Sequence, residues 1–498
     1  MIKQLKLKNF KSFKNEQTLN IAPITLIYGP NSSGKSSVIQ SLLLLNQSIL
    51  NTDAIKNNEL ASKGENLDLG LPLNFLHKGN TKSPMVISFK EQIDLSKRRI
   101  NWRKKEEKQL PEDLIDLDLT LEFKQDTDDD PYSALKFQKI IYKIKTKENE
   151  IFEFSFIKFK QNEYKFLNIT SAKNAAKLFI KYEHEIFENE DSEKIKNLKP
   201  LVKKITLSEL SEKFTTIIFS NRGLFSDVNF LPTFTFRDFS KAEKNNFEYS
   251  FHWNRLMTDI NFPIDRAIRS LNHISGLRNS PQRYYPLTNT RGFVGRSGEN
   301  MAALLLKLSK GPNKNQLNKW LKKLEIPYQI SVEPTQDKLA GSLLIMKLKD
   351  LRNNVEVTPS DVGIGISQIL PLLIQGMSET ANTSARNKNP NIRCVEQPEL
   401  HLHPRLQANL ADFFIDTVKQ NPNLKWILET HSESLMLRLQ KRIRNKEISK
   451  DQISVNYVNP VKGGFSNLIE LRLDDEGDFI DEWPNGFFEE AYLEKFTN

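Results

Sequence analysis

The pattern of apolar and polar positions predicts how the chain begins. Residues 2–10 alternate between the two kinds, which is typical of a strand with one buried face. A short apolar run at residues 24–28 predicts a buried strand, and it leads directly into a glycine-containing loop. Residues 36–50 include four consecutive leucines and favour a helix. The predicted order is therefore strand, strand, glycine loop, helix.

A similar pattern returns from about residue 271. Leucines at helical spacing predict a helix over 299–323, and residues 341–348 predict a strand. Two further apolar strands, 393–395 and 426–428, each end at an acidic residue, with a helix expected between them at 405–418. Strand, helix and strand in this order favour a parallel sheet covered by helices.

Residues 91–270 differ from both ends of the chain. They include a basic run at 97–108, an acidic run at 126–130, and Phe- and Ile-rich stretches such as 151–157 that alternate like strands. No heptad repeat is sustained there, which argues against a long coiled coil. We therefore expect an N-terminal lobe at 1–90, an insertion at 91–270 and a C-terminal lobe at 271–498.

The composition is that of a highly charged soluble protein, with 38% apolar and 27% charged residues. The chain has no apolar run of about 18 residues, and its start lacks the apolar core of a signal peptide. The single cysteine, Cys394, is expected to be buried and fits the cytosol. The net charge of +10, from 72 basic and 62 acidic residues, leaves nucleic-acid contact open and equally suits a solvated lysine-rich surface.

The loop at residues 29–36 reads GPNSSGKS and fits the phosphate-binding pattern GxxxxGK[ST] without a mismatch. Backbone N–H groups of such a loop, with the N-terminus of the following helix, cradle phosphate oxygens. Lys35 is expected at the β- and γ-phosphates and Ser36 on Mg²⁺, so the predicted cofactors are ATP and Mg²⁺. The residues expected to contact the nucleotide are Gly29, Asn31, Ser32, Ser33, Gly34, Lys35, Ser36 and Ser37.

Acidic residues at the two later strand ends supply the predicted catalytic groups. Glu396 directly ends the first strand and is expected to hold Mg²⁺ with Ser36, directly or through water. Gln397 can orient an attacking water but cannot accept its proton, so Glu399 is the candidate base. Two alternatives stay open: Glu399 only holds the loop while Gln397 orients water, or hydrolysis is slow. His431 follows the second strand and is expected to donate to the γ-phosphate.

Residues 360–368, SDVGIGISQ, open another predicted helix. Gly363, Gly365 and Ser367 there form a second anion-binding element. One ATP does not need two such loops from one subunit, so this element is expected to cap the γ-phosphate of a neighbour's ATP in a head-to-tail pair. His401 and His403 are too few for a closed zinc site, and we expect a structural or dimer-contact role for them.

Together these motifs resemble the SMC/RecF-like branch of ABC-type ATPases. The likeness rests on NFKSF at 9–13, the phosphate loop, GIGISQ at 363–368, PELHLHP at 398–404 and ETHS at 429–432. Residues 276–285, 298–300 and 483–488 are similar to segments of prokaryotic AAA ATPases with a C-terminal DUF3696 region. The resemblance covers the two ends of the chain. It implies an α/β fold, an ABC-type P-loop ATPase head with a large mixed α/β insertion. In this group the Glu-Gln-Pro-Glu order resembles the usual form, so Gln397 does not by itself imply an inactive enzyme.

The resemblance implies an ATP-hydrolysing switch in a bacterial complex, most of all in anti-phage defence. Such a switch would form a homodimer or larger oligomer through its heads, control a separate effector such as a nuclease, and use the insertion to bind a partner or trigger. Relatives also include OLD-type nucleases, and an OLD-like ATP-dependent nuclease is one alternative. Its metal-binding acids would have to come from residues 474–478 and 489–490. We interpret these acidic residues instead as a solvated loop.

Two other functions compete with the switch. An SMC/RecF-like DNA-repair ATPase fits the same motifs, whereas a transporter motor is disfavoured by the divergent signature and the SMC-like start. We expect a cytoplasmic protein without membrane contact. The sequence leaves open the trigger, the effector, nucleic-acid binding, the number of subunits and the function of the insertion.

Overall fold

The structure is a computed structural model. It describes residues 2–95, 114–125, 133–160, 163–170, 174, 178, 223–225, 234–235, 244–290, 292–311, 314–337, 341–381, 391–486 and 488. The basic run at 97–108, the acidic run at 126–130 and the acidic pair at 489–490 lie outside the described residues. The chain divides into two compact units, one of Met1–Thr18 and Ser41–Arg269, the other of Leu19–Gln40 and Ser270–Asn498.

The second unit is built on a six-stranded sheet in the order β11-β16-β17-β3-β18-β19. The neighbours from β11 to β18 are parallel, and β19 is antiparallel to β18. The strands are β11 (Asn272–Ile274), β16 (Asn391–Glu396), β17 (Leu424–Glu429), β3 (Ile24–Tyr28), β18 (Ile453–Val461) and β19 (Phe465–Leu471). The predictions of buried parallel strands ending at Glu396 and Glu429 are confirmed, as is the α/β fold class.

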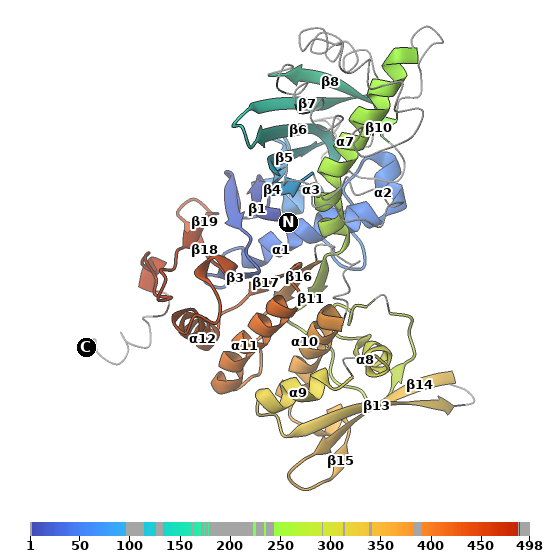
Figure 1. Ribbon diagram of the computed structural model, residues 1–498, viewed down its shortest axis with the longest axis vertical. Helices are drawn as coiled ribbons and strands as arrows, with labels where there is room; N and C mark the ends of the chain where they lie inside the picture. The colour runs from blue at the N-terminus through green and yellow to red at the C-terminus, as the bar shows by residue number, and fades with distance from the viewer. Residues whose placement is uncertain are drawn as a thin grey trace. The chain divides into compact units, whose positions relative to one another are not determined.

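Three helices of this unit carry or follow the predicted motifs. They are α10 (Ile364–Ala381), α11 (Pro404–Gln420) and α12 (Glu433–Arg444), and α11 contacts the other two (Figure 1). The single helix predicted over 299–323 is wrong, because α8 (Met301–Ser309) and α9 (Gln316–Lys323) replace it. The sequence Gly311-Pro312 between them explains the break, since proline removes a backbone donor and glycine favours non-helical backbone.

A smaller sheet completes the second unit. It consists of β12 (Tyr285–Pro286), β14 (Gly341–Asp350) and β13 (Tyr328–Asp337), with β15 (Glu356–Val357) paired to β14. Short 3₁₀ turns form η3 (Pro359–Asp361), η4 (Lys450–Gln452) and η5 (Pro484–Gly486).

Aromatic rings fill the core between α9, α11 and the six-stranded sheet. The Trp320 and Phe413 rings meet edge to face at 4.9 Å, and Trp426 packs against Phe414 at 5.1 Å. Thr417 Oγ1 accepts a hydrogen bond of 2.9 Å from the buried Trp426 indole, so this large side chain leaves no unpaired donor. Cys394 lies in the same sheet and is fully buried, as expected, and burial raises the pKa of its thiol.

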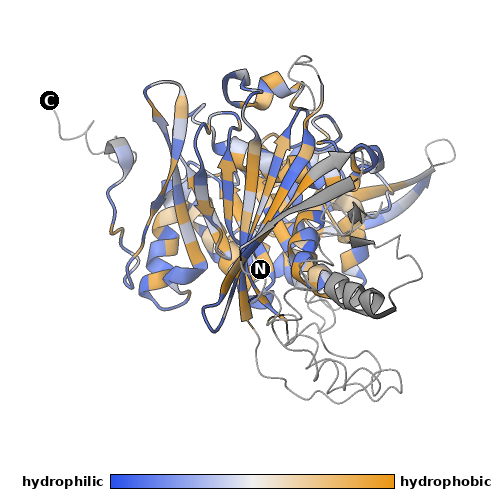
Figure 2. Ribbon diagram, turned by 90° about the horizontal axis from the view of Figure 1, so that it is seen from above, coloured by the Kyte–Doolittle hydropathy of each residue, from blue (hydrophilic) through white to orange (hydrophobic). Residues whose placement is uncertain are grey.

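The first unit contains a nine-stranded sheet in the order β10-β9-β8-β7-β6-β5-β4-β1-β2. Pairs from β10 to β1 are antiparallel. Along β5, residues 115, 117, 119 and 121 are buried and alternate with partly exposed ones. Figure 2 shows hydrophobic and hydrophilic residues alternating along long strands. The strands are β1 (Ile2–Lys8), β2 (Gln17–Asn20), β4 (Met85–Asp94), β5 (Leu114–Lys124), β6 (Lys136–Thr146), β7 (Ile151–Lys160), β8 (Glu163–Ile169), β9 (Gly223–Phe225) and β10 (Phe234–Thr235).

The described residues also form the helices α1 (Lys35–Leu50), α2 (Thr52–Asn57), α3 (Pro72–Phe75) and α7 (Lys244–Arg269) and the turn η1 (His77–Gly79). Helix α1 agrees with the helix predicted directly after the glycine loop. Among the helices that the described residues form, none is both long enough and apolar enough to span a bilayer.

Candidate nucleotide site

The predicted phosphate loop and the predicted residues after β16 and β17 meet at one edge of the six-stranded sheet. The loop at 29–34 follows β3, while Glu429 ends β17 and Glu396 ends β16. These strands are parallel neighbours, with Glu396 opposite Glu429 and Glu429 opposite Ile27. Their carboxyl ends therefore lie side by side, which is where open α/β sheets bind ligands.

The glycine loop has a backbone that the neighbouring strands fix in place. Gly29 and Gly34 have φ values of 143° and 106°, in the region that favours glycine. A Cβ on Gly29 would lie 2.6 Å from the carbonyl oxygen of Val458 on β18, so no larger residue fits. On β19, Ser466 Oγ donates a 2.6 Å hydrogen bond to the carbonyl of Ser33.

Lys35 is the first residue of α1 and is only 5% exposed. Its Nζ donates to the carbonyls of Gly29 at 3.0 Å and Pro30 at 2.9 Å, so the ammonium group is held over the loop. Burial lowers the pKa of Lys35, and the nearby carboxylates of Glu429 and Glu399 oppose this effect. A cation held beside a helix N-terminus is suited to phosphate oxygens.

Three carboxylates of this edge have different partners. Ser36 Oγ donates to Glu429 Oε1 at 3.1 Å, whereas Glu429 Oε2 is buried and makes no hydrogen bond. Glu396 Oε1 lies 3.1 Å from His273 Nε2, and its Oε2 accepts from the N–H of Gly276 at 3.4 Å. Burial raises the pKa of Glu429, which Glu396 reinforces and Ser36 opposes. Burial acts the same way on Glu396, but the contacts with His273 and Gly276 bring its pKa below the usual value.

Glu399 is held by hydrogen bonds to both of its carboxylate oxygens. Thr430 Oγ1 donates at 2.8 Å and the backbone N–H of His431 at 2.7 Å. Burial raises the pKa of Glu399, and these two donors oppose the rise. A carboxylate oxygen has two lone pairs, so Glu399 keeps the capacity to accept a proton while it holds the loop.

Gln397 and His431 complete the predicted catalytic set. Gln397 has a φ of 44°, and its N–H donates to the carbonyl of Glu429 at 2.7 Å, which ties the loop to the end of β17. His431 is half-buried, and burial, reinforced by the positive charge of Lys35, lowers its pKa. A neutral imidazole can donate one hydrogen bond beside Lys35 without adding a second positive charge.

The model of the AAA ATPase domain family matches residues 1–436. The chain belongs to the AAA ATPase domain family. This membership agrees with the phosphate loop and the acidic strand ends described above. A comparison with curated proteins gives no match.

Among solved structures, the chain is similar to three SMC heads, each at 10% identity over 95% of this chain. The SMC head domain from Thermotoga maritima is covered over 99% of its length with a TM-score of 0.34. An SMC head bound to the C-winged helix domain of ScpA is covered over 98% with a TM-score of 0.36. The Smc head of Pyrococcus furiosus with an extended coiled coil, bound to the C-terminal domain of ScpA, is covered over 96% with a TM-score of 0.35.

Two residues of this AAA ATPase domain escaped the sequence prediction. His273 lies in β11, a three-residue strand too short to give a pattern, and it reaches the carboxylate of Glu396. Arg278 is 8% exposed and donates to the carbonyls of Gln368 at 3.3 Å, Glu396 at 3.0 Å and Gln397 at 3.4 Å. Burial lowers the pKa of Arg278 to about 10, and the charges of Glu399 and Glu396 oppose this. Arg278 therefore connects α10 to the loop that carries the candidate base.

The predicted second anion-binding element lies at the start of α10. Gly363 precedes the helix, is exposed, and has no atom within 4 Å of the position its Cβ would take. Gly365 is inside the first turn, where a Cβ would lie 2.6 Å from the carbonyl oxygen of His401. Ser367 is buried and its hydroxyl donates to the carbonyl of Pro359 at 3.0 Å, so in the single chain it connects α10 to η3.

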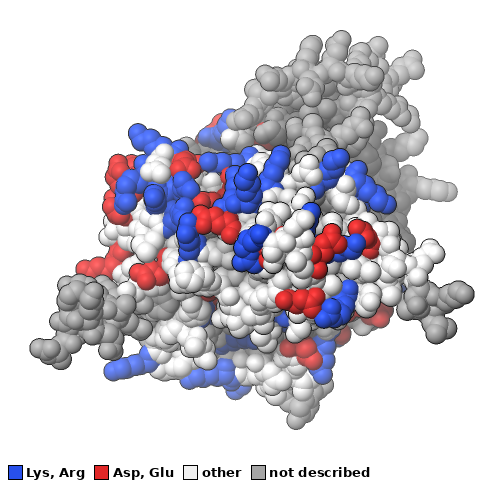
Figure 3. All heavy atoms as spheres, turned by 90° about the horizontal axis from the view of Figure 1, so that it is seen from below, with Lys and Arg blue, Asp and Glu red and all other residues white. Residues whose placement is uncertain are grey.

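His401 and His403 are both exposed, and His403 has a structural contact. Its Nδ1 accepts a 3.3 Å hydrogen bond from the backbone N–H of Arg405, which caps α11. Over the described part of the chain, no group of three or more His, Cys, Asp or Glu side chains could hold a metal ion by itself. On the face in Figure 3, Lys and Arg side chains are interspersed with Asp and Glu.

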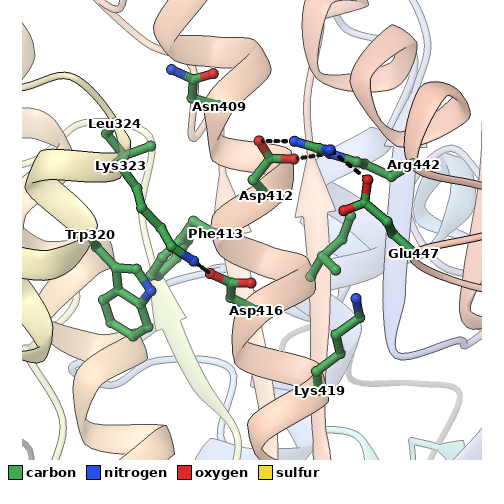
Figure 4. A pocket seen from close by; sticks show the side chains of 11 residues that line it. Trp320, Lys323, Leu324, Asn409, Asp412, Phe413, Asp416, Lys419, Arg442 and Glu447 are labelled. Atoms are coloured by element: carbon green, nitrogen blue, oxygen red, sulfur yellow. Dashed lines mark hydrogen bonds and ion pairs between the residues drawn. The ribbon is translucent and has the colours of Figure 1, made fainter. Parts of the chain in front are cut away.

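A separate pocket of about 260 Å³ lies between α9, α11 and the end of α12 (Figure 4). None of the predicted nucleotide-site residues lines it. Lys323 pairs with Asp416 at 2.6 Å, and Arg442 pairs with Asp412 and Glu447, each at 2.6 Å. Each acidic side chain of this pocket is thus already paired with a base, and the pairs connect the three helices.

Proposed function

We propose that this chain is an ATP-binding and ATP-hydrolysing switch subunit of a bacterial complex. It acts in the cytosol in anti-phage defence and controls a separate effector such as a nuclease. The observation that carries the nucleotide part is the meeting of Lys35 and Ser36 with three carboxylates at the carboxyl edge of a parallel sheet. Membership of the AAA ATPase domain family supports ATP as the ligand.

The residues present fit Mg²⁺, because hydroxyl and carboxylate oxygens are ligands that this ion takes. One buried carboxylate oxygen of the site, Glu429 Oε2, has no hydrogen-bond partner and can bind a cation. Ser36 and the acidic strand ends would hold it, and the ion would neutralise charge on the phosphates. Lys35 and the N–H groups of the loop bind the β- and γ-phosphates. Glu399 takes the proton of the attacking water that Gln397 orients, and His431 donates to the γ-phosphate.

The switch consists of two chains joined through their ATP sites. Gly363 and the 52% exposed Ile364 begin α10, so the N–H groups of that helix end are open to a neighbour's γ-phosphate. Gly365 packs on the carbonyl of His401, and Arg278 links α10 to the loop after β16. A contact at the start of α10 would therefore act on the loop that holds Glu399.

Mixed dimers test this arrangement. Lys35→Ala removes a chain's own phosphate contact, and Gly363→Arg puts a long side chain at the neighbour-facing position, where it meets nothing in its own chain. In a head-to-tail pair of the two variants, one site carries both changes and the other carries neither. ATPase activity should return on mixing, while Asn353→Arg, an exposed control in the same unit, should behave as wild type. Proven mixed dimers that stay inactive would contradict the proposal.

The defence role needs a cellular test. Cells that express the chain with its neighbouring genes should plate phage less efficiently than cells with the Lys35→Ala variant. An equal number of plaques with both variants, at equal protein levels, would argue against a defence switch and leave the ATP site untouched.

A further inference from the structure

We propose that Glu429, at the end of β17, is the carboxylate that binds Mg²⁺ directly together with Ser36, and that Glu396 contacts the ion only through water. The inference rests on the proposed ATP site and names a ligand that the sequence patterns did not assign. It is carried by the spacing of two oxygens, by one unpaired buried oxygen, and by the order of the strands.

The first argument is the distance between the two oxygens. Ser36 Oγ and Glu429 Oε1 are 3.1 Å apart. Mg²⁺ binds oxygens at 2.0–2.1 Å in octahedral geometry, so two adjacent ligands are roughly 3.0 Å apart. The hydroxyl and the carboxylate therefore already have the separation that neighbouring ligands of this ion require.

The second argument is the unpaired oxygen of Glu429. Its Oε2 is buried and has no hydrogen-bond partner, whereas buried polar atoms in proteins are nearly always paired. The other two acids of the edge are already engaged: Glu396 with His273 and Gly276, and Glu399 with Thr430 and His431. Of the three carboxylates, Glu429 is thus the one that contacts Ser36 through one oxygen and has a second oxygen without a hydrogen bond.

The third argument is the strand order. β17 pairs directly with β3, from which the phosphate loop starts, whereas β16 lies on the far side of β17. Neighbouring strands are about 4.8 Å apart, so the Glu396 backbone is about twice as far from the loop strand as that of Glu429. Glu396 is accordingly suited to a water-mediated position, which its contact with His273 holds in place.

The test compares Glu429→Gln with the matched variant Glu396→Gln, because each change removes one charge and keeps the side-chain shape. Mn²⁺ replaces Mg²⁺ as the probe, and its free electron paramagnetic resonance signal is followed as it binds to protein with a non-hydrolysable ATP analogue. Glu429→Gln should weaken Mn²⁺ binding at least tenfold and Glu396→Gln less than threefold. Nucleotide affinity in EDTA, measured by calorimetry, should change less than threefold in both.

The outcomes separate the inference from the proposed function. If wild-type protein binds no nucleotide by calorimetry, the ATP site itself is wrong and the inference falls with it. If nucleotide binds but Glu396→Gln loses as much Mn²⁺ affinity as Glu429→Gln or more, only the assignment of Glu429 is overturned. Should Glu429→Gln not fold, as judged by circular dichroism, Glu429→Asp is compared with Glu396→Asp, because each change keeps the charge and withdraws the carboxylate. Glu429→Asp should weaken Mn²⁺ binding more than Glu396→Asp, and an equal or smaller loss overturns the assignment.

Discussion

Replacing Arg278 with methionine should slow ATP hydrolysis far more than it destabilises the protein. Arg278 holds the carbonyls of Glu396 and Gln397 from one side and that of Gln368 in α10 from the other. Only the 3.0 Å bond to Glu396 has ordinary length, so the three together are worth roughly 3–5 kcal/mol when the donor is charged. Against this, burial lowers the Arg278 pKa from 12.5 to about 10, a cost of about 3 kcal/mol for keeping the charge.

These opposing amounts leave a net loss of about 0–2 kcal/mol in the free energy of unfolding for Arg278→Met. The effect on the rate is larger, because displacement of a catalytic group by about 1 Å costs on the order of 100-fold, or roughly 2.7 kcal/mol in the barrier. Arg278→Lys keeps the charge but not the forked geometry, so its ATPase rate should lie between those of wild type and Arg278→Met. Arg352→Met, at a 64% exposed arginine of the same unit, is the matched control.

Steady-state ATPase rates and urea unfolding of the same preparations check this reasoning. It fails if Arg278→Met hydrolyses ATP within threefold of wild type. It also fails if the loss of rate simply follows the fraction of unfolded protein, because the arginine would then act on stability alone.

Three more changes test individual contacts. Glu399→Gln should bind ATP normally by calorimetry yet hydrolyse it about 10²–10⁴-fold more slowly. Normal turnover in Glu399→Gln, with slow turnover in Gln397→Ala, would instead assign the activation of water to Gln397. Gly365→Ala should cost about 1–3 kcal/mol in urea unfolding, since its Cβ would lie 2.6 Å from the His401 carbonyl oxygen, and Gly363→Ala should cost much less. Glu379→Ala leaves the buried Arg393 without its 2.7 Å partner and should cost about 3–5 kcal/mol, against about 0–1 for the exposed Glu333→Ala, and equal melting temperatures would refute this.

The local parts of the fold could be predicted from the sequence because their signals lie within a few residues. The apolar run before the glycine loop forms β3, and the leucine-rich segment after it forms α1. The strands ending at Glu396 and Glu429 are also parallel, as the helix between them indicated. Periodicity failed over 299–323, where a break of a few residues divides the segment into α8 and α9.

The contacts inside the site could not be predicted, because they join positions that no local pattern relates. Ser36 and Glu429 meet only because β17 inserts between β16 and β3. Arg278 follows a strand of three residues, and its three acceptors are backbone carbonyls, which have no sequence signature. The roles of the predicted site residues, and the boundaries at 90 and 270, stay predictions; across residue 90, β4 continues to Asp94 and pairs with β5.

The position of β3 in the sheet has a consequence for how the protein is made. All five of its residues are buried, and its two neighbours, β17 and β18, begin only at Leu424 and Ile453. At 5–20 residues per second, a ribosome needs roughly 20–80 s to deliver them after β3 has emerged. Through that interval an apolar strand with free edges is exposed to other nascent chains, a common origin of aggregation. Yield of folded protein should therefore depend on chaperones that bind early segments, more than final stability alone would suggest.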